Sequence, residues 1–279
     1  MSRLIECPDV QTVITNPNSK IIHLPAGDFI VSESIVLDGQ YLRGANMQTR
    51  LYPEPGVTAI TIKSPPSTER RWDTAFNPTT KMFAGCEGIV IAGTFEGQRG
   101  IITEGQCDQV HMQDIKVANC DGGGIHFNPV TGFIRESHFS NLSCDKCGSG
   151  TTPALGIYQP DTGSGDGTNN LYFYNTRLVY SYGTALLIRN SDADERIREI
   201  KFESGLFHMM DADGPGPWSL VILDNAIGQI DGISFRMRFR GDDAEVVPTI
   251  VPGTAINCFY SGTHFPYTSA VVGVTVLPG

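Results

Sequence analysis

Two aspartates follow a cysteine in similar local contexts, and their spacing would let their carboxyl groups act together. Asp121 stands in Cys-Asp-Gly-Gly-Gly, and Asp145 stands in Cys-Asp-Lys-Cys. Glycoside hydrolysis needs two carboxyl groups about 5 to 9.5 Å apart, one as acid and the other as nucleophile or base. Aspartates are also frequent turn residues, because their side chains accept hydrogen bonds from nearby backbone groups. We favour the turn interpretation and keep Asp121 and Asp145 as the catalytic candidates.

A second group of candidates consists of aromatic and basic side chains at positions expected to point outward from short strands. The expected faces carry His111, Arg135, Tyr172, Tyr174, Lys201 and Arg236 on one side, and His126 and Tyr158 on the next. Aromatic rings offer an apolar face to sugars, while arginine donates to hydroxyl groups. The predicted carbohydrate-binding residues are His126, Tyr158, Arg135, Tyr172 and Tyr174. The same strip could instead be buried between subunits, and both alternatives remain open.

The elements that must position these residues recur along the chain. Short apolar alternations appear at residues 88–91, 109–112, 133–135, 171–174, 200–202 and 233–235, and a second set at 100–103, 124–127, 156–159, 186–189, 220–223 and 255–258. Repeated short strands bounded by Gly, Asn, Asp or Ser are typical of a solenoid. Because side chains alternate along a strand, we expect Ile125, Phe127 and Phe173 to point into a shared core. A β-sandwich is the competing architecture, but it needs more hairpin turns.

The N-terminal coil resembles a known superfamily. Residues 21–31 read as an apolar strand, a Pro-Ala-Gly turn and a second strand, and residues 34–46 contain a Leu-Arg-Gly step. This order is similar to the first coil of the right-handed parallel β-helix proteins, the pectin-lyase-like superfamily. The resemblance implies an all-β, single-stranded right-handed parallel β-helix with a short N-terminal capping helix, for which Asp9 is the expected N-cap. The predicted boundaries are a cap over 1–19, the β-helix over 20–262, and a C-terminal β cap or subunit-contact segment over 263–279.

The superfamily includes pectate lyases, polygalacturonases, epimerases and the tailspikes of bacteriophages, so the resemblance indicates a fold more than a reaction. The polygalacturonase motifs do not match: Asp242-Asp243 comes too late in the chain, and Gly124-Ile-His126 differs from the family's Gly-His-Gly. No catalytic residue of the family is therefore carried over. We expect a bacteriophage virion protein, a homotrimer of the tailspike type that contacts other virion proteins, with host-surface polysaccharide as a candidate ligand. The alternative is a polysaccharide-degrading hydrolase or lyase.

Composition and short motifs argue against several classes of function. The 279-residue chain has a net charge of −10, which argues against a nucleic-acid partner because such a partner favours a basic surface. No stretch resembles a signal peptide or a membrane span, so we expect assembly in a host cytoplasm, no membrane insertion and a place in the virion. Cys144-Asp-Lys-Cys147 has the spacing of a zinc half-site, but no complementary pair accompanies it. We expect buried cysteines, with Cys120 and Cys144 at similar points of successive rungs, and no metal or cofactor.

Overall fold

The structure is a computed structural model of the chain and describes residues 7–14, 19–63, 84–150, 152–161, 167–181, 183–209, 221–224, 228–241, 258–261 and 274–276. It contains one short helix, α1 (Val10–Val13), and eighteen strands within this part of the chain. The strands are β1 (Ile21–His23), β2 (Gly27–Val31), β3 (Ile35–Asp38), β4 (Tyr41–Arg43), β5 (Thr49–Pro53), β6 (Thr58–Lys63), β7 (Gly85–Ala92), β8 (Arg99–Asp108), β9 (His111–Ala118), β10 (Ile125–Asp145), β11 (Leu155–Gln159), β12 (Asn169–Ser181), β13 (Leu186–Asn190), β14 (Arg196–Met209), β15 (Val221–Asp224), β16 (Gln229–Gly241), β17 (Cys258–Ser261) and β18 (Val274–Val276).

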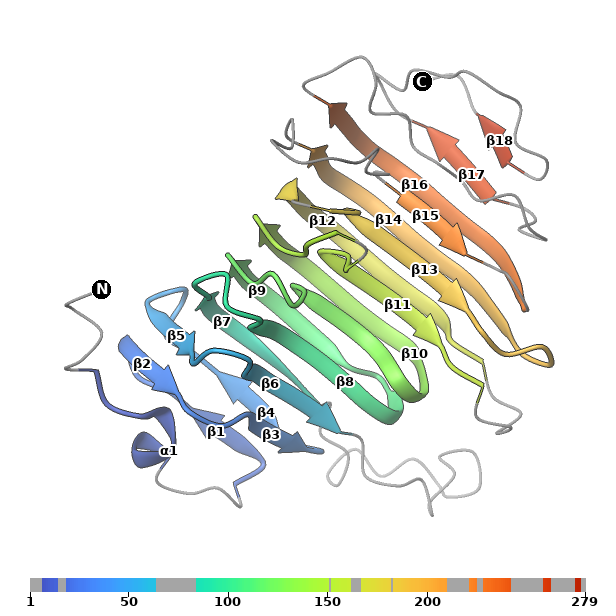
Figure 1. Ribbon diagram of the computed structural model, residues 1–279. Coiled ribbons are helices and arrows are strands. Elements are labelled where there is room, and N and C mark those ends of the chain that lie inside the picture. Colours follow the sequence, from blue (N-terminus) through green and yellow to red (C-terminus); the bar gives the residue numbers. More distant parts are fainter. Residues whose placement is uncertain are drawn as a thin grey trace, which may run out of the picture.

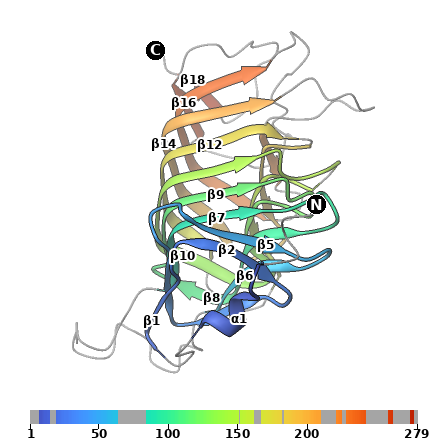
Figure 2. The same ribbon diagram turned by 90° about the vertical axis from the view of Figure 1, so that its left-hand side faces the viewer.

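The strands stack in parallel, one rung on the next (Figures 1 and 2). One run of neighbours is β6, β8, β10, β11, β13 and β15, and another is β7, β9, β10, β12, β14 and β16. Every pairing between the described strands is parallel, whereas a β-sandwich is built from antiparallel pairs. The predicted right-handed parallel β-helix is confirmed.

Single residues with positive φ bend the long strands into corners. Asp114, Asn141 and Asn175 have φ of 53°, 55° and 53° and stack on one another along one corner. Asn and Asp tolerate this left-handed conformation better than most residues. Their side chains also bond along the stack, because Asn141 Nδ2 donates to Asp114 Oδ1 at 2.7 Å and Asn175 Nδ2 donates to Asn141 Oδ1 at 2.9 Å. One strand can therefore contribute to two faces of the solenoid.

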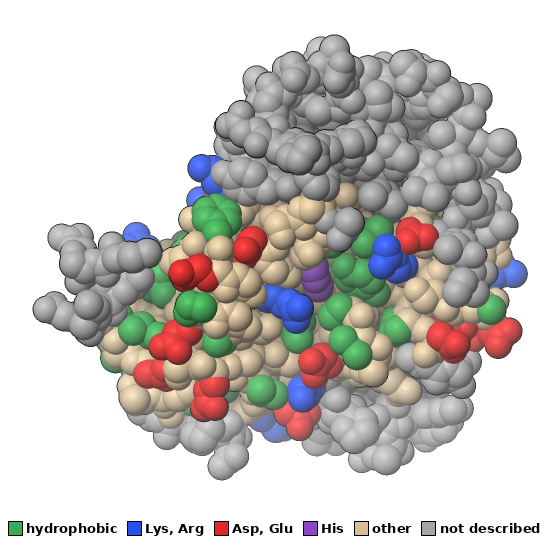
Figure 3. Space-filling model, in the orientation of Figure 1, with side chains coloured by type: hydrophobic (Ala, Val, Ile, Leu, Met, Phe, Trp, Pro, Cys, Tyr) green, Lys and Arg blue, Asp and Glu red, His purple; other side chains and the backbone are tan. Residues whose placement is uncertain are grey.

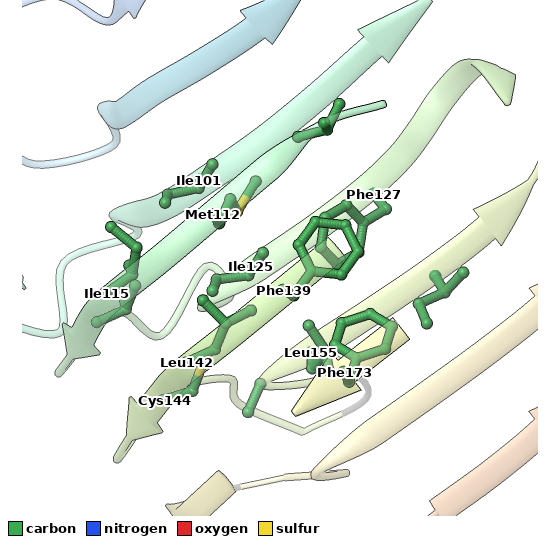
Figure 4. Close-up of a cluster of buried hydrophobic side chains, with 14 of the residues drawn as sticks. Ile101, Met112, Ile115, Ile125, Phe127, Phe139, Leu142, Cys144, Leu155 and Phe173 are labelled. Carbon is green, nitrogen blue, oxygen red and sulfur yellow. The ribbon is translucent and has the colours of Figure 1, made fainter. Parts of the chain in front are cut away.

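Phenylalanine rings stack through the core (Figure 4). Phe139 and Phe173 lie 4.6 Å apart between ring centroids, and Phe173 and Phe202 lie 4.5 Å apart. Two more rings pack against this stack. The ring centroid of Phe127 lies 4.7 Å from that of Phe139, and the ring centroid of Phe235 lies 5.1 Å from that of Phe202. Such contacts between rungs stabilise coils that cannot bury their own apolar faces.

The N-terminal end is capped as the sequence predicts. Asp9 accepts a hydrogen bond from the backbone N–H of Gln11 at 2.9 Å and starts α1. The backbone N–H of Ile30 donates to Pro8 O at 3.0 Å, which ties this segment to β2. The helix lies against the first coil in Figure 2, where it shields part of an otherwise open strand edge. In the predicted C-terminal segment, residues 263–273 and 277–279 lie outside the described residues, while β18 pairs with β17.

Candidate functional site

A row of outward side chains crosses neighbouring rungs of one face. The register places His111 of β9 beside His138 of β10, then Tyr172 of β12 and Lys201 of β14. Each of these residues precedes an inward side chain of the core, as Tyr172 precedes Phe173, so strand alternation turns the row outward.

The rings of this row are arranged to present an aromatic surface. The His138 and Tyr172 rings are stacked, with centroids 5.1 Å apart and planes 7° apart. The ammonium group of Lys201 lies 5.1 Å from the centroid of the Tyr172 ring, a cation–π distance. Tyr172 is 37% exposed, and Tyr174, two residues further along β12, is 61% exposed. We refer to His138, Tyr172 and Tyr174 as the aromatic ridge.

Charged groups border the ridge on its C-terminal side. Tyr174 pairs in register with Glu203 of β14, and Glu203 pairs with Arg236 of β16. The Arg236 guanidinium lies 3.8 Å from the Glu203 carboxylate, and the Arg236 side chain is 75% exposed and the Glu203 side chain 41%. Such an exposed ion pair contributes little to stability. Its donors and acceptors are therefore free to exchange with the hydroxyl groups of a ligand.

Arg135 does not lie on this ridge, which corrects the expected face. Its strand position pairs with Asp108 of β8 and Asn169 of β12, and its guanidinium forms an ion pair with Asp108. The same guanidinium lies 4.7 Å from the ring centroid of Phe133. Glu136, with φ of 50°, turns the chain directly after Arg135 and brings His138 into the row instead. His138 was missed because a glutamate gives no sequence signal for a left-handed corner.

His126 and Tyr158 come together on the next face, as the sequence predicts, but both are recessed. His126 is 7% exposed, and its Nε2 lies at 2.9 Å from the carbonyl oxygen of Pro153. The His126 and Tyr158 rings meet edge to face at 5.7 Å, and burial raises the pKa of Tyr158 to about 12. The Tyr158 ring folds over Gly156, where a Cβ atom would lie 2.4 Å from it. Carbohydrate contact by this pair stays a prediction.

His126 makes the stability of the fold depend on pH. Burial, against a hydrogen bond to Pro153, lowers the pKa of His126 from 6.5 to about 4. Between these values the unfolded chain binds a proton that the folded chain does not, so stability falls as pH falls from about 6.5 to about 4. The expected loss is up to about 3 kcal/mol in the free energy of unfolding. Urea unfolding at several pH values checks this.

The matched control for that experiment is His23→Gln, because His23 is exposed at the end of β1. His126→Gln should flatten the pH dependence, whereas His23→Gln should leave it unchanged. Equal slopes for the native protein and His126→Gln would contradict the assignment.

Asp121 and Asp145 do not occupy equivalent positions. The register pairs Asp145 with Ala118 of β9, so Asp121 lies three residues beyond the position that Asp145 faces. Asp121 Oδ1 accepts a hydrogen bond from the backbone N–H of Gly97 at 2.7 Å, as a turn aspartate does. Asp145 Oδ2 lies 3.8 Å from Lys116 Nζ, and its Oδ1 is buried without a hydrogen-bond partner. Catalysis by this pair stays a prediction, and the observed hydrogen bond favours a turn role for Asp121.

The cysteine pattern forms part of the core. Cys120, Cys144 and Cys147 are buried free thiols, and Cys144 pairs with Val117 rather than with Cys120, which corrects the expected stacking. Hydrogen bonding to Cys147 and burial raise the pKa of Cys120 and Cys144. Among the described residues, no group of three or more His, Cys, Asp or Glu side chains could hold a metal ion. In the same residues no helix is long and apolar enough to cross a membrane.

Similarity to known proteins is found among solved structures. No family model and no curated protein matches the sequence. Among solved structures, the ORF18 product of Geobacillus virus E2 matches with a TM-score of 0.62 and 17% identity, over 92% of this chain and 52% of that one. The chain has the parallel β-helix fold. It spans about half the length of the viral protein.

Two further matches are enzyme modules from Azotobacter vinelandii. The A-module of mannuronan C-5 epimerase AlgE6 gives a TM-score of 0.48 at 15% identity, covering 98% of this chain and 84% of the module. The A-module of AlgE4 gives 0.42 at 14% identity, covering 92% and 79%.

Proposed function

We propose that this β-helix is a rigid module of a bacteriophage virion that binds host-surface carbohydrate through the aromatic ridge. The observation that carries the carbohydrate proposal is the exposure of Tyr172 and Tyr174 beside the Lys201 ammonium, whereas most other large rings in the described part of the chain are buried. Exposed tyrosines offer a flat apolar face with a polar tip, and they lose little conformational entropy on binding. The ridge stands on parallel strands, which fix it before any ligand arrives.

The virion setting and the homotrimer belong to the same proposal. The viral protein with this fold motivates the setting, and a stack of rungs suits a stiff spacer because each coil packs on its neighbours. Light scattering on the purified chain tests the trimer, and a monomeric mass would contradict it. Figure 3 shows acidic side chains and fewer basic ones on one face of the described part of the molecule.

Removing the rings of the ridge should weaken glycan binding. We expect Tyr172→Ala combined with Tyr174→Ala to lower affinity for a bound bacterial surface glycan at least about tenfold, because each ring supplies stacking area. The measurement is a glycan-array screen followed by titration of the strongest ligand. Circular dichroism should show unchanged β structure, since both side chains lie outside the core.

The control is Phe95→Ala, because Phe95 is also an exposed ring, at 42%, in the turn between β7 and β8. It should bind as the native protein does. Equal losses of glycan affinity in the ridge variant and in Phe95→Ala would indicate that exposed rings bind the glycan nonspecifically. Native binding by the ridge variant would reject the ridge as the site.

A further inference from the structure

A row of basic residues runs along the solenoid beside the aromatic ridge, on the other side of the Asp114, Asn141 and Asn175 corner. The register places in line, from β5 to β16, Arg50, Val90, Lys116, Ser143, Arg177, Leu206 and Arg238. We call Arg50, Lys116, Arg177 and Arg238 the basic row. Between β5 and β16 no acidic residue occupies this line, and its next position toward the N-terminus is Asp28 of β2, which pairs with Arg50.

The cations recur on every second rung. Since rungs lie about 4.8 Å apart, neighbouring charges of the row are separated by roughly 10 Å along the solenoid. This interval keeps like charges from lying directly opposite one another, which would be destabilising. Ser143 and Leu206 occupy the rungs on either side of Arg177 and place no charge between its neighbours.

The two halves of the row differ in their partners. Arg50 lies 3.6 Å from the Asp28 carboxylate, and Lys116 lies 3.8 Å from that of Asp145. Arg177 and Arg238 are exposed, and no carboxylate of the described residues forms an ion pair with either. Among the residues that the structure describes, the C-terminal half of the row therefore presents guanidinium groups that have no carboxylate partner.

We infer that the glycan bound by this module is an anionic polysaccharide whose regularly spaced acidic groups are held by Arg177 and Arg238. This inference rests on the proposed carbohydrate function. Tyr174 and Arg177 lie on the same strand, on either side of the Asn175 corner, so one polymer can contact the ridge and the row together. Arginine binds carboxylate or phosphate groups through two parallel hydrogen bonds. An extended polymer with an acidic group in each repeat matches a row of evenly spaced cations.

Titration with anionic polymers tests this inference. The probes are polygalacturonate, its carboxyl-reduced neutral form and a glycerol-phosphate teichoic acid, each measured against the native protein and against Arg177→Gln combined with Arg238→Gln. We expect that at least one anionic polymer binds the native protein and binds the double variant about tenfold more weakly, with a shallower salt dependence. The carboxyl-reduced polymer should bind both proteins equally.

The matched control is Arg196→Gln combined with Arg198→Gln, because it removes the same charge from exposed positions of β14 on a different face. An equal loss of affinity in this control would show that binding depends on net charge alone, and it would overturn the inference. Failure of every anionic polymer to bind more tightly than the neutral form would also overturn it, while retained neutral binding would leave the ridge as a carbohydrate site. Tighter binding of a DNA duplex than of any polysaccharide would replace both proposals.

Discussion

Phe173→Ala should lower the free energy of unfolding by about 3 to 5 kcal/mol, the usual cost of truncating a buried phenylalanine. Phe173 is 1% exposed and lies between the rings of Phe139 and Phe202, so its removal leaves a cavity across adjacent rungs. The expected loss is large for this fold because each coil is stabilised mainly by its neighbours. Urea unfolding followed by circular dichroism measures it.

Tyr174→Ala on the adjacent position of the same strand is the control, because that side chain is 61% exposed. It should change the free energy of unfolding by no more than about 0.5 kcal/mol. A comparable loss in both variants would show that the position in the strand, rather than the ring stack, determines stability. A loss below about 1 kcal/mol for Phe173→Ala would indicate that the neighbouring rings close the cavity.

Gly132→Ala should prevent the native packing of β10 on β8, whereas Gly105→Ala should be tolerated. The two glycines pair in register and have similar backbone conformations, with φ of 85° and 79°. A Cβ atom at Gly132 would lie 2.0 Å from the carbonyl oxygen of Gly105, while a Cβ atom at Gly105 meets nothing within 4 Å. Comparing the two variants therefore distinguishes the cost of a backbone collision from the cost of backbone strain.

Gly105→Ala should cost about 1 to 2 kcal/mol, the price of a left-handed conformation for a residue with a side chain. Gly132→Ala adds a collision with backbone atoms, which a side-chain rotation cannot relieve, and we expect a loss of more than about 4 kcal/mol or no soluble protein. Thermal unfolding and soluble yield distinguish the two variants. Similar melting temperatures would show that β10 shifts away from β8 at little cost.

The inward residues of the strands could be read from the sequence, because alternation alone determines which side chains share a face. Ile125, Phe127 and Phe173 were predicted to point inward, and each is at most 1% exposed. The corners could not be read in the same way. Glu136 turns the chain inside a single 21-residue strand, although glutamate is an unusual residue for a positive φ.

The errors in the candidate site follow from those corners. The bend at Glu136 places Arg135 and His138 on different faces, and because this bend was not recognised, Arg135 was expected where His138 lies. The register was also unknown from the sequence, so Asp121 and Asp145 were expected at equivalent positions, whereas Asp145 pairs with Ala118. Tyr172 and Tyr174 were placed correctly because no corner interrupts β12 between them and the core residue Phe173.

The Asp114, Asn141 and Asn175 corner has a consequence for how such a protein can change in length. A single residue makes the turn on each of these rungs, so the angle between the flanking faces is the same from coil to coil. Inserted residues at other corners leave that angle untouched. Duplicating a coil would lengthen both faces in step by about 4.8 Å. The number of coils thus sets the length of both faces at once.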